Sequence, residues 1–263
     1  MSSKINDLAK VKDLFADWEE TMIWSCLQGV MGEIYADDAE HPKSAVAIIG
    51  VFAFFAGEPN RELVLYKPKG YPGDFVIMVP QTDAWNAVIE ECYPNSTKKV
   101  ERYALKKEPE VFDKGKLQQM ADGLPEEYEL KLLDEAVFAE TKKADWCADW
   151  TAQYSDYETY KKFGLGVVIF KNGQLVSGAF SYTSYENGIE IQVDTKEECR
   201  RKGLASACSA KLILECLKRG LYPSWDAQNK GSLALAERLG YHYSHTYTAY
   251  EVCGYGRDLP YKS

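Results

Sequence analysis

The sequence predicts a mixed α/β fold in two parts, and three stretches support that prediction. The first is a continuous apolar run, 46–56, typical of a strand buried on both faces. The second is Asn172-Gly173 between two alternating segments, which favours a two-residue β-hairpin turn. The third is an alternating segment, 188–194, followed by a basic glycine turn and an amphipathic helix. Strands and helices therefore interleave along the chain.

We expect two domains. A chain of 263 residues with 46% hydrophobic residues can bury two compact cores or one large one. The charged stretch 106–115, which holds Pro109, is the best boundary. We therefore place an N-terminal α/β domain at 1–108, a linker with a short helix at 109–127, and a second domain at 128–263. The first domain is a candidate for substrate recognition.

In the N-terminal part, Leu8, Val11 and Phe15 recur at helical spacing and predict a helix over 4–20. The run 46–56 follows as a single strand. Alternation and bounding turn residues predict the remaining elements: strands at 75–79 and 98–105, and helices at 82–92 and 116–122.

The C-terminal part begins with a strand at 128–133, and one or two helices follow within 134–161. The helix that starts at Leu204 has an apolar stripe every fourth residue and stops at Gly220. Periodicity predicts the other elements: strands at 166–170, 174–183, 188–194 and 222–226, a helix at 229–239, and a terminal strand or pair of strands at 241–252.

Charge and cysteine content exclude several classes of function. A net charge of −9 argues against general binding to nucleic acid or to an anionic membrane, and it suits a cationic amine substrate. The seven cysteines are scattered, and Cys208 and Cys216 fall on the apolar stripe of a helix, so we expect reduced thiols in a cytoplasm. Only two of the three histidines, His242 and His245, lie close in sequence, so we expect no metal. The oligomeric state stays open.

The segment from Arg200 to Ala205 predicts a phosphate site. Gly203 permits close approach of the backbone to a ligand, and the following helix offers unpaired N–H groups at its positive end. Two arginines and Lys202 add positive charge. These features suit a pyrophosphate, although an isolated cluster of this kind is more often a solvated charge cluster before an ordinary helix.

The spacing Arg-x-x-Gly-x-Ala between a strand and a helix resembles the acetyl-coenzyme A signature of the GNAT superfamily of N-acetyltransferases. The segment 229–241 is similar to that family's second signature, an Asn that opens a short helix ending in Leu-Gly-aromatic. The stretch 225–241 is further similar to a branch that includes a zwittermicin A resistance acetyltransferase. The resemblance covers the chain from Tyr128 onward strongly. It implies a twisted mixed sheet flanked by helices, preceded by a smaller α/β domain or by a degenerate second copy of the fold.

The resemblance implies direct acetyl transfer from acetyl-coenzyme A to a primary amine, in a ternary complex and without a metal. The residues expected to bind the cofactor surround the two signatures: Val193, Thr195, Arg200, Arg201, Lys202, Gly203, Leu204, Ala205, Asn229 and Ser232. The main chain at Val193 and Thr195 would face the pantetheine arm. Asn229 is either a helix cap alone or a cap that also contacts the cofactor.

The resemblance also implies candidates for catalysis and for substrate binding. Glu190 is the candidate general base, or else an exposed strand carboxylate, and Tyr182 is a candidate acid. Asp226 and Glu186 are candidate contacts for a small-molecule amine, and Glu186 lies nearer the position where some members of the family keep their base. Where many relatives carry a tyrosine that protonates the leaving thiolate, this chain has Ala236. That departure motivates an alternative function, a catalytically silent acyl-coenzyme A sensor or interaction module.

Overall fold

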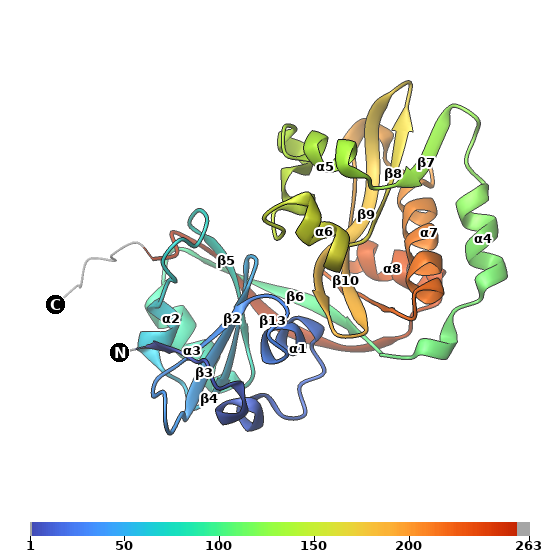
Figure 1. Cartoon of the computed structure of the whole chain (residues 1–263). Helices are drawn as coiled ribbons and strands as arrows, with labels where there is room; N and C mark the ends of the chain where they lie inside the picture. The colour runs from blue at the N-terminus through green and yellow to red at the C-terminus, as the bar shows by residue number, and fades with distance from the viewer. Residues whose placement is uncertain (1, 257–263) are drawn as a thin grey trace. The chain divides into compact units, whose positions relative to one another are not determined.

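The computed structural model describes residues 2–256, and the chain divides into two compact units. The first unit contains the residues up to Arg102 and those from Thr246 onward, and the second unit is Tyr103–His245. The chain leaves the first unit within strand β6 (Thr97–Leu105) and returns within β13 (Tyr243–Cys253), as the colours of Figure 1 show. This division lies ahead of the charged stretch expected to be the boundary, and it assigns most of the last strand to the first unit.

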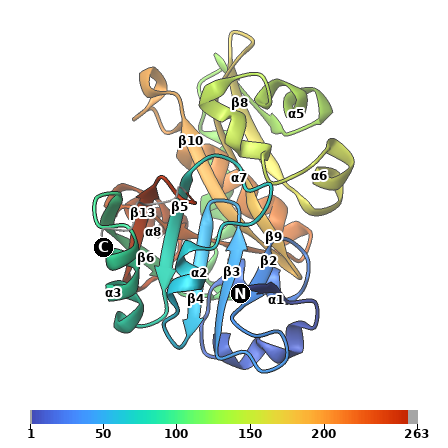
Figure 2. The same cartoon turned by 90° about the vertical axis from the view of Figure 1, so that its left-hand side faces the viewer.

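The sheet of the first unit contains five consecutive strands and part of β13. The strands are β1 (Ser3–Lys4), β2 (Glu33–Ala36), β3 (Ser44–Ile49), β4 (Phe52–Gly57) and β5 (Phe75–Pro80). Each strand from β1 to β4 pairs antiparallel with the next, whereas β4 and β5 are parallel. Figure 2 shows β3, β4 and β5 side by side, and β13 pairs antiparallel with β5.

Helices cover both faces of this sheet. On one face, α2 (Arg61–Leu65) and α3 (Asp83–Cys92) pack on a core that includes Phe55 and Trp85, whose rings lie 5.2 Å apart. On the other side, Trp18 packs edge-on against Phe54, and α1 (Thr21–Leu27) contacts β3. Strands β3 and β4 are therefore buried on both faces, as the apolar run predicted.

Two predictions for this unit are wrong. The segment 46–56 is two strands joined by a tight turn at Gly50, which has φ 56°. The prediction missed this turn because a run buried on both faces has no periodicity that could reveal it. The segment 4–20 forms two short 3-10 helices, η1 (Leu8–Lys10) and η2 (Lys12–Phe15), rather than an α-helix. Residues three or four apart share a face in both helix types, so spacing alone does not separate them.

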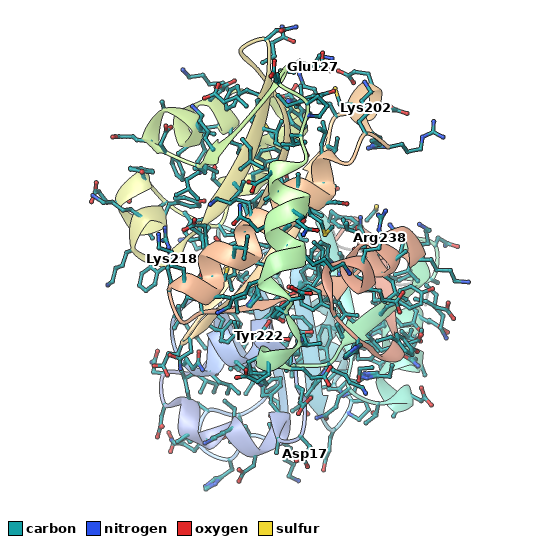
Figure 3. All side chains as sticks on the ribbon, turned by 90° about the vertical axis from the view of Figure 1, so that its right-hand side faces the viewer. Asp17, Glu127, Lys202, Lys218, Tyr222 and Arg238 are labelled. Carbon is teal, nitrogen blue, oxygen red and sulfur yellow. The ribbon has the colours of Figure 1, made fainter. Side chains whose placement is uncertain are left out.

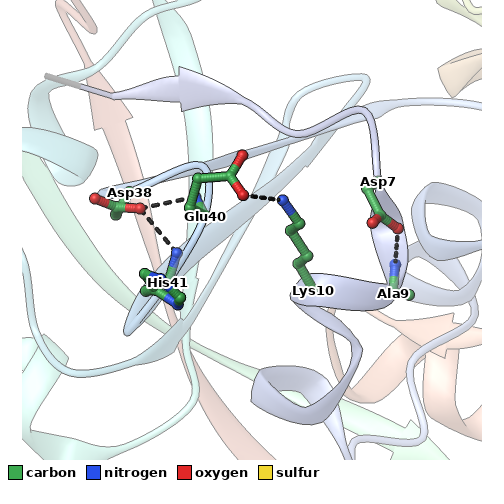
Figure 4. Close-up of polar contacts among 6 residues, drawn as sticks. All are labelled: Asp7, Ala9, Lys10, Asp38, Glu40 and His41. Atoms are coloured by element: carbon green, nitrogen blue, oxygen red, sulfur yellow. Dashed lines mark hydrogen bonds and ion pairs between the residues drawn. The ribbon is translucent and has the colours of Figure 1, made fainter.

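The turn between β2 and β3 is organised by local hydrogen bonds (Figure 4). Asp38 accepts the backbone N–H groups of Glu40 and His41 at 2.7 and 2.8 Å. Lys10 forms an ion pair with Glu40 at 2.7 Å, but the glutamate is exposed, so this pair contributes little to stability.

The sheet of the second unit repeats the topology of the first. Its strands are β7 (Tyr128–Leu132), β8 (Gly166–Lys171), β9 (Gln174–Tyr185), β10 (Gly188–Thr195) and β11 (Tyr222–Ser224). The first four again pair antiparallel in order, and β10 and β11 are again parallel. In both units a helix connects the parallel pair, namely α2 in the first and α7 (Leu204–Lys218) in the second. The chain therefore contains two copies of one α/β topology.

Helices enclose the second sheet from both sides (Figure 1). On one side lie α5 (Glu135–Thr141), the 3-10 helix η4 (Asp145–Thr151) and α6 (Tyr157–Phe163), so the one or two helices expected here are three short elements. On the other side, α7 packs on the sheet and α4 (Lys114–Asp122) packs on α7. The remaining elements complete the unit: η3 (Pro109–Val111), η5 (Glu197–Cys199), β12 (Asp226–Ala227) and α8 (Lys230–Leu239).

The stretch 109–127 contributes side chains to the core of the second unit. Phe112, Leu117 and Ala121 are buried, and Phe112 packs edge-on against Tyr241 at 5.0 Å. Within the described part of the chain, no helix is both long enough and apolar enough to cross a bilayer.

Candidate functional site

The N-terminus of α7 is open toward solvent. Gly203 occupies the N-cap position with φ 82°, and no side chain of the described residues caps the helix there. A Cβ placed on Gly203 would meet nothing within 4 Å. The first N–H groups of an α-helix have no partner inside the helix, so this end offers a free set of donors at the positive pole of its dipole. An anionic group fits this position.

Basic side chains brace the loop that leads to α7. The Arg200 Nε donates to the carbonyl of Thr195 at 3.2 Å, and Lys202 Nζ donates to the carbonyl of Glu198 at 2.9 Å. Arg201 adopts the left-handed conformation with φ 61°, and its side chain is exposed. Figure 3 shows Lys202 just ahead of α7 and Lys218 at the far end of that helix. The loop therefore carries its positive charge beside the open helix end.

Strand β10 presents a free backbone edge beside this loop. It pairs with β11 only over Gly188 to Glu190, and its last five residues continue without a β11 partner. The N–H of Lys196 donates to Val176 in β9 at 2.9 Å. Because N–H groups alternate between the two edges of a strand, those of Val193 and Thr195 point to the free edge. Their role beside an extended ligand arm stays a prediction.

The second signature segment is a capped helix. Asn229 Oδ1 accepts the N–H of Ser232 at 2.9 Å, so the cap is present and the Asn229 amide NH₂ takes no part in it. The Ser232 hydroxyl accepts the indole N–H of Trp225 at 3.0 Å. Trp225 is buried in the core, and Ala236 is fully buried. No phenol can replace Ala236 here without displacing core side chains.

Three buried polar residues form a row across the sheet where β10 and β11 separate. Glu190 lies opposite Thr183 in β9 and opposite Ser224 in β11. The relative exposure is 3% for Glu190 and 0% for the other two, so the alternative of an exposed strand carboxylate is wrong. A β-bulge follows directly, between Glu190 and Ile191. We call Thr183, Glu190 and Ser224 the polar row.

The charge of Glu190 contributes to the raised pKa values of two nearby phenols, Tyr222 and Tyr241. Burial raises the pKa of Tyr222 to about 12, and the Glu190 charge adds to that increase. Burial also raises the pKa of Tyr241 well above its usual value of 10.0, again with a smaller contribution from Glu190. Neither phenol is poised to ionise near neutral pH.

The other candidates from the sequence lie apart from one another. Tyr182 is buried in β9 at the bulge, next in sequence to Thr183. Glu186 is exposed in the turn between β9 and β10. Asp226 lies in β12, where it pairs with Ala104 of β6, so the expected strand 222–226 is two short strands with different partners. Of these three candidates, only Tyr182 is next to a residue of the polar row, and the strand register skips it at the bulge.

A polar network that the sequence did not predict lies on the face of β10 opposite α7. Gln192 donates to Asp149 at 3.0 Å and to Asp194 at 3.1 Å, and the indole N–H of Trp150 also donates to Asp194 at 3.2 Å. Burial raises the pKa of Asp194, and the negative charge of Asp149 raises it further. The alternation of Glu190, Gln192 and Asp194 was visible in the sequence, but their partners on η4 were not.

The first unit has no equivalent free edge among its described residues. Its parallel pair, β4 and β5, stays joined to the end of β4, because the N–H of Gln81 donates to Phe55 at 3.0 Å and the Gln81 side chain accepts the N–H of Gly57 at 3.0 Å. Asn60 caps α2 by accepting the N–H groups of Glu62 and Leu63. The corresponding strand gap and helix end are therefore filled by the unit's own residues.

Comparisons with known proteins agree with this fold. A profile of the GNAT acetyltransferase family matches residues 12–250. The crystal structure of a GCN5-related N-acetyltransferase-like protein from Streptococcus suis 89/1591 is 48% identical, with a TM-score of 0.87 over 93% of this chain and 98% of that one. The uncharacterised N-acetyltransferase YdfB of Bacillus subtilis strain 168 is 27% identical over 92% of this chain and 94% of its own length.

A tandem GNAT protein from the clavulanic acid biosynthesis pathway shares the fold, with a TM-score of 0.55 over 97% of this chain at 9% identity. Its likeness agrees with the repeated topology. The fold and the site thus define the class, an acyltransferase built from two mixed α/β units. More particularly, the chain belongs to the GNAT acetyltransferase family.

Proposed function

We propose that this protein transfers an acetyl group from acetyl-coenzyme A to a primary amine of a small molecule. The observation that carries the proposal is the free edge of β10 beside the uncapped, glycine-opened N-terminus of α7. One strand edge and one helix end thus offer adjacent backbone donors for an extended arm and for a diphosphate. The first unit fills both features with its own side chains.

In this proposal, the backbone N–H groups of Val193 and Thr195 bind the pantetheine arm. The open end of α7, from Gly203 to Ala205, binds the diphosphate. Arg200, Arg201 and Lys202 supply positive charge, and the Asn229 amide contacts the arm from α8. Ser232 has a hydroxyl bonded to Trp225, so it acts by orienting α8.

Bound acetyl-coenzyme A would supply an acetyl group activated as a thioester. The amine must lose one proton for each acetyl group it gains, and Glu190 is the proposed acceptor of that proton, directly or through water. Tyr182, at the bulge beside the polar row, is the candidate donor of a proton to the leaving sulfur. Transfer then depends mainly on holding the amine in line with the acetyl group.

The acceptor is proposed to be cationic and small. The net charge of −9 favours approach of an ammonium compound to this protein. Asp226 and Glu186 remain candidate contacts for its more distant groups. Two further parts of the proposal rest on sequence. We propose that the chain belongs to the branch that includes the zwittermicin A resistance acetyltransferase, and that the protein is cytoplasmic.

The direct test is release of free thiol from acetyl-coenzyme A in the presence of 1,4-diaminobutane, glucosamine or glycinamide. We expect wild type to turn over at least one of these amines. Glu190→Gln should lower kcat by about a hundredfold, a magnitude typical of lost general base catalysis, with an unchanged Kd for acetyl-coenzyme A. Glu129→Gln, a matched change at an exposed carboxylate of strand β7, serves as the control for a role of Glu190 in the chemical step.

The second candidate function is a sensor that binds acyl-coenzyme A without turnover. The fully buried Ala236, in place of the acidic phenol of many relatives, favours it. Calorimetry with acetyl-coenzyme A separates the two. Binding without thiol release from any amine supports the sensor, and absence of binding contradicts both functions.

A further inference from the structure

We propose that Thr183 is a positioning residue, whose hydroxyl orients the Glu190 carboxylate for proton transfer. This inference rests on the proposed function and extends it to a second residue of the polar row.

The Thr183 hydroxyl is buried and makes no hydrogen bond to any described residue. The side chain is 0% exposed, and its Oγ1 has no hydrogen-bond partner among the described residues. Burying a hydroxyl without a partner costs free energy, so natural proteins rarely keep one in a sheet without a reason. Valine would fill the same volume and suit a β-strand at least as well. The hydroxyl is therefore better explained by the site than by the fold.

Strand register places this hydroxyl beside Glu190. The two residues face each other across β9 and β10, in the last regular pair before the bulge. Side chains that oppose each other in an antiparallel pair point to the same face of the sheet, with Cβ atoms about 4.5–5.5 Å apart. A rotation about χ1 can therefore bring Oγ1 to a carboxylate oxygen. The other buried hydroxyls without a partner, those of Tyr160 and Ser209, lie on α6 and α7.

The chemistry requires that Glu190 change its charge during the reaction. Before transfer it is a carboxylate, and a hydroxyl donor stabilises that form and fixes its orientation. On transfer, one oxygen of Glu190 takes the proton that leaves the amine nitrogen as the new bond to the acetyl carbon forms. Thr183 keeps its own proton throughout and donates to the other oxygen. The residue thus acts through Glu190 and not on the substrate.

The test compares Thr183→Val, which removes the hydroxyl at constant volume, with Thr183→Ser, which retains it. With the best amine of the panel, we expect Thr183→Val to lower kcat by about tenfold to a hundredfold, the effect of one hydrogen bond to a charged group. Kd for acetyl-coenzyme A should stay within twofold. Thr183→Ser should retain wild-type kcat within about threefold. Ser209→Ala, a matched loss of another buried hydroxyl without a partner, should leave kcat unchanged.

A double-mutant comparison isolates the link to Glu190. In the Glu190→Gln background, Thr183→Val should cause no further loss of kcat, because the carboxylate that it positions is gone. Equal losses from Thr183→Val in both backgrounds would overturn the inference, as would an unchanged kcat in Thr183→Val. A fall in thermal stability shared by Thr183→Val and Thr183→Ser would assign the residue a purely structural role. If wild type turns over no amine, the proposed function itself fails and the inference with it.

Discussion

At the scale of single residues, folding raises the pKa of some carboxyl groups of this protein and lowers the pKa of others. Burial and the nearby charge of Asp149 raise the pKa of Asp194 above its ordinary 3.8. Hydrogen bonds from the backbone at Thr159 and from neighbouring hydroxyls lower the pKa of Asp156, the N-cap of α6. The two residues should therefore affect stability with opposite dependence on pH.

Asp194→Asn should raise the melting temperature at pH 7. Because folding raises the pKa of Asp194, the folded protein holds this proton more tightly than the unfolded chain does, and ionisation at neutral pH costs stability. Asparagine avoids that cost and can still accept a hydrogen bond from Trp150. The gain should shrink as pH falls through the raised pKa toward 3.8, because the folded wild-type carboxyl then takes up its proton. Melting curves recorded from neutral pH down to below 3.8 measure it.

Asp156→Asn is the control, because it removes an ionised cap whose pKa is lowered. Its effect should be a loss of stability that is fully present at pH 7 and that fades as pH falls below 3.8. A change in Asp194→Asn that is the same at every pH would contradict the electrostatic explanation and would indicate altered packing against Trp150.

At the scale of elements, the sequence around the site predicted more than the sequence elsewhere. Alternation from Gly188 to Asp194 and the apolar stripe after Leu204 predicted β10 and α7 with nearly their observed bounds. The predicted helix over 4–20 was wrong, because the apolar spacing of Val11 and Phe15 fits a short 3-10 helix as well as an α-helix. The predicted role of Gly203 depends on a conformation that the structure supplies, a positive φ at an uncapped helix end.

Gly203→Glu should weaken acetyl-coenzyme A binding by about a hundredfold, because a carboxylate beside a diphosphate introduces like-charge repulsion of several kcal/mol. Gly220→Glu, beyond the other end of α7, is its matched control. Gly220 also has a positive φ, 70°, and open space around a Cβ. Both variants should lose about 1 kcal/mol of folding stability from backbone strain. Calorimetry should show lost affinity in the first variant alone, and equal losses in both would contradict the placement of the diphosphate.

At the scale of the whole molecule, the chain contains one strand topology twice, but among residues 2–256 only the second copy has a free strand edge between its parallel strands. In the second unit, β10 extends past β11, whereas in the first unit Gln81 joins the ends of β4 and β5. The first copy is therefore degenerate at the position where a cofactor would bind. Its core of aromatic side chains, including Phe54 and Phe55, is fully buried.

We expect each chain to bind one molecule of acetyl-coenzyme A. Calorimetry with wild type should give a stoichiometry near one per chain, and Gly203→Glu should remove that binding without revealing a second site. A stoichiometry of two would contradict the conclusion that the first unit fills its own gap. In that case Gln81→Ala, which removes the side chain that joins the ends of β4 and β5, should change the affinity for acetyl-coenzyme A at the site in the first unit only.

The sequence by itself determined the class of fold, the order of elements around the predicted phosphate site from Arg200 to Ala205, and the residues of the two signatures. These are local properties, because periodicity, turn residues and helix caps act over a few neighbours along the chain. Only the tertiary structure decided that Glu190 is buried, that Thr183 faces it, and that Gln192 joins Asp149 to Asp194. It also showed that the first half repeats the topology of the second. These contacts join strands and helices distant in sequence, and strand register sets them, which local patterns do not encode.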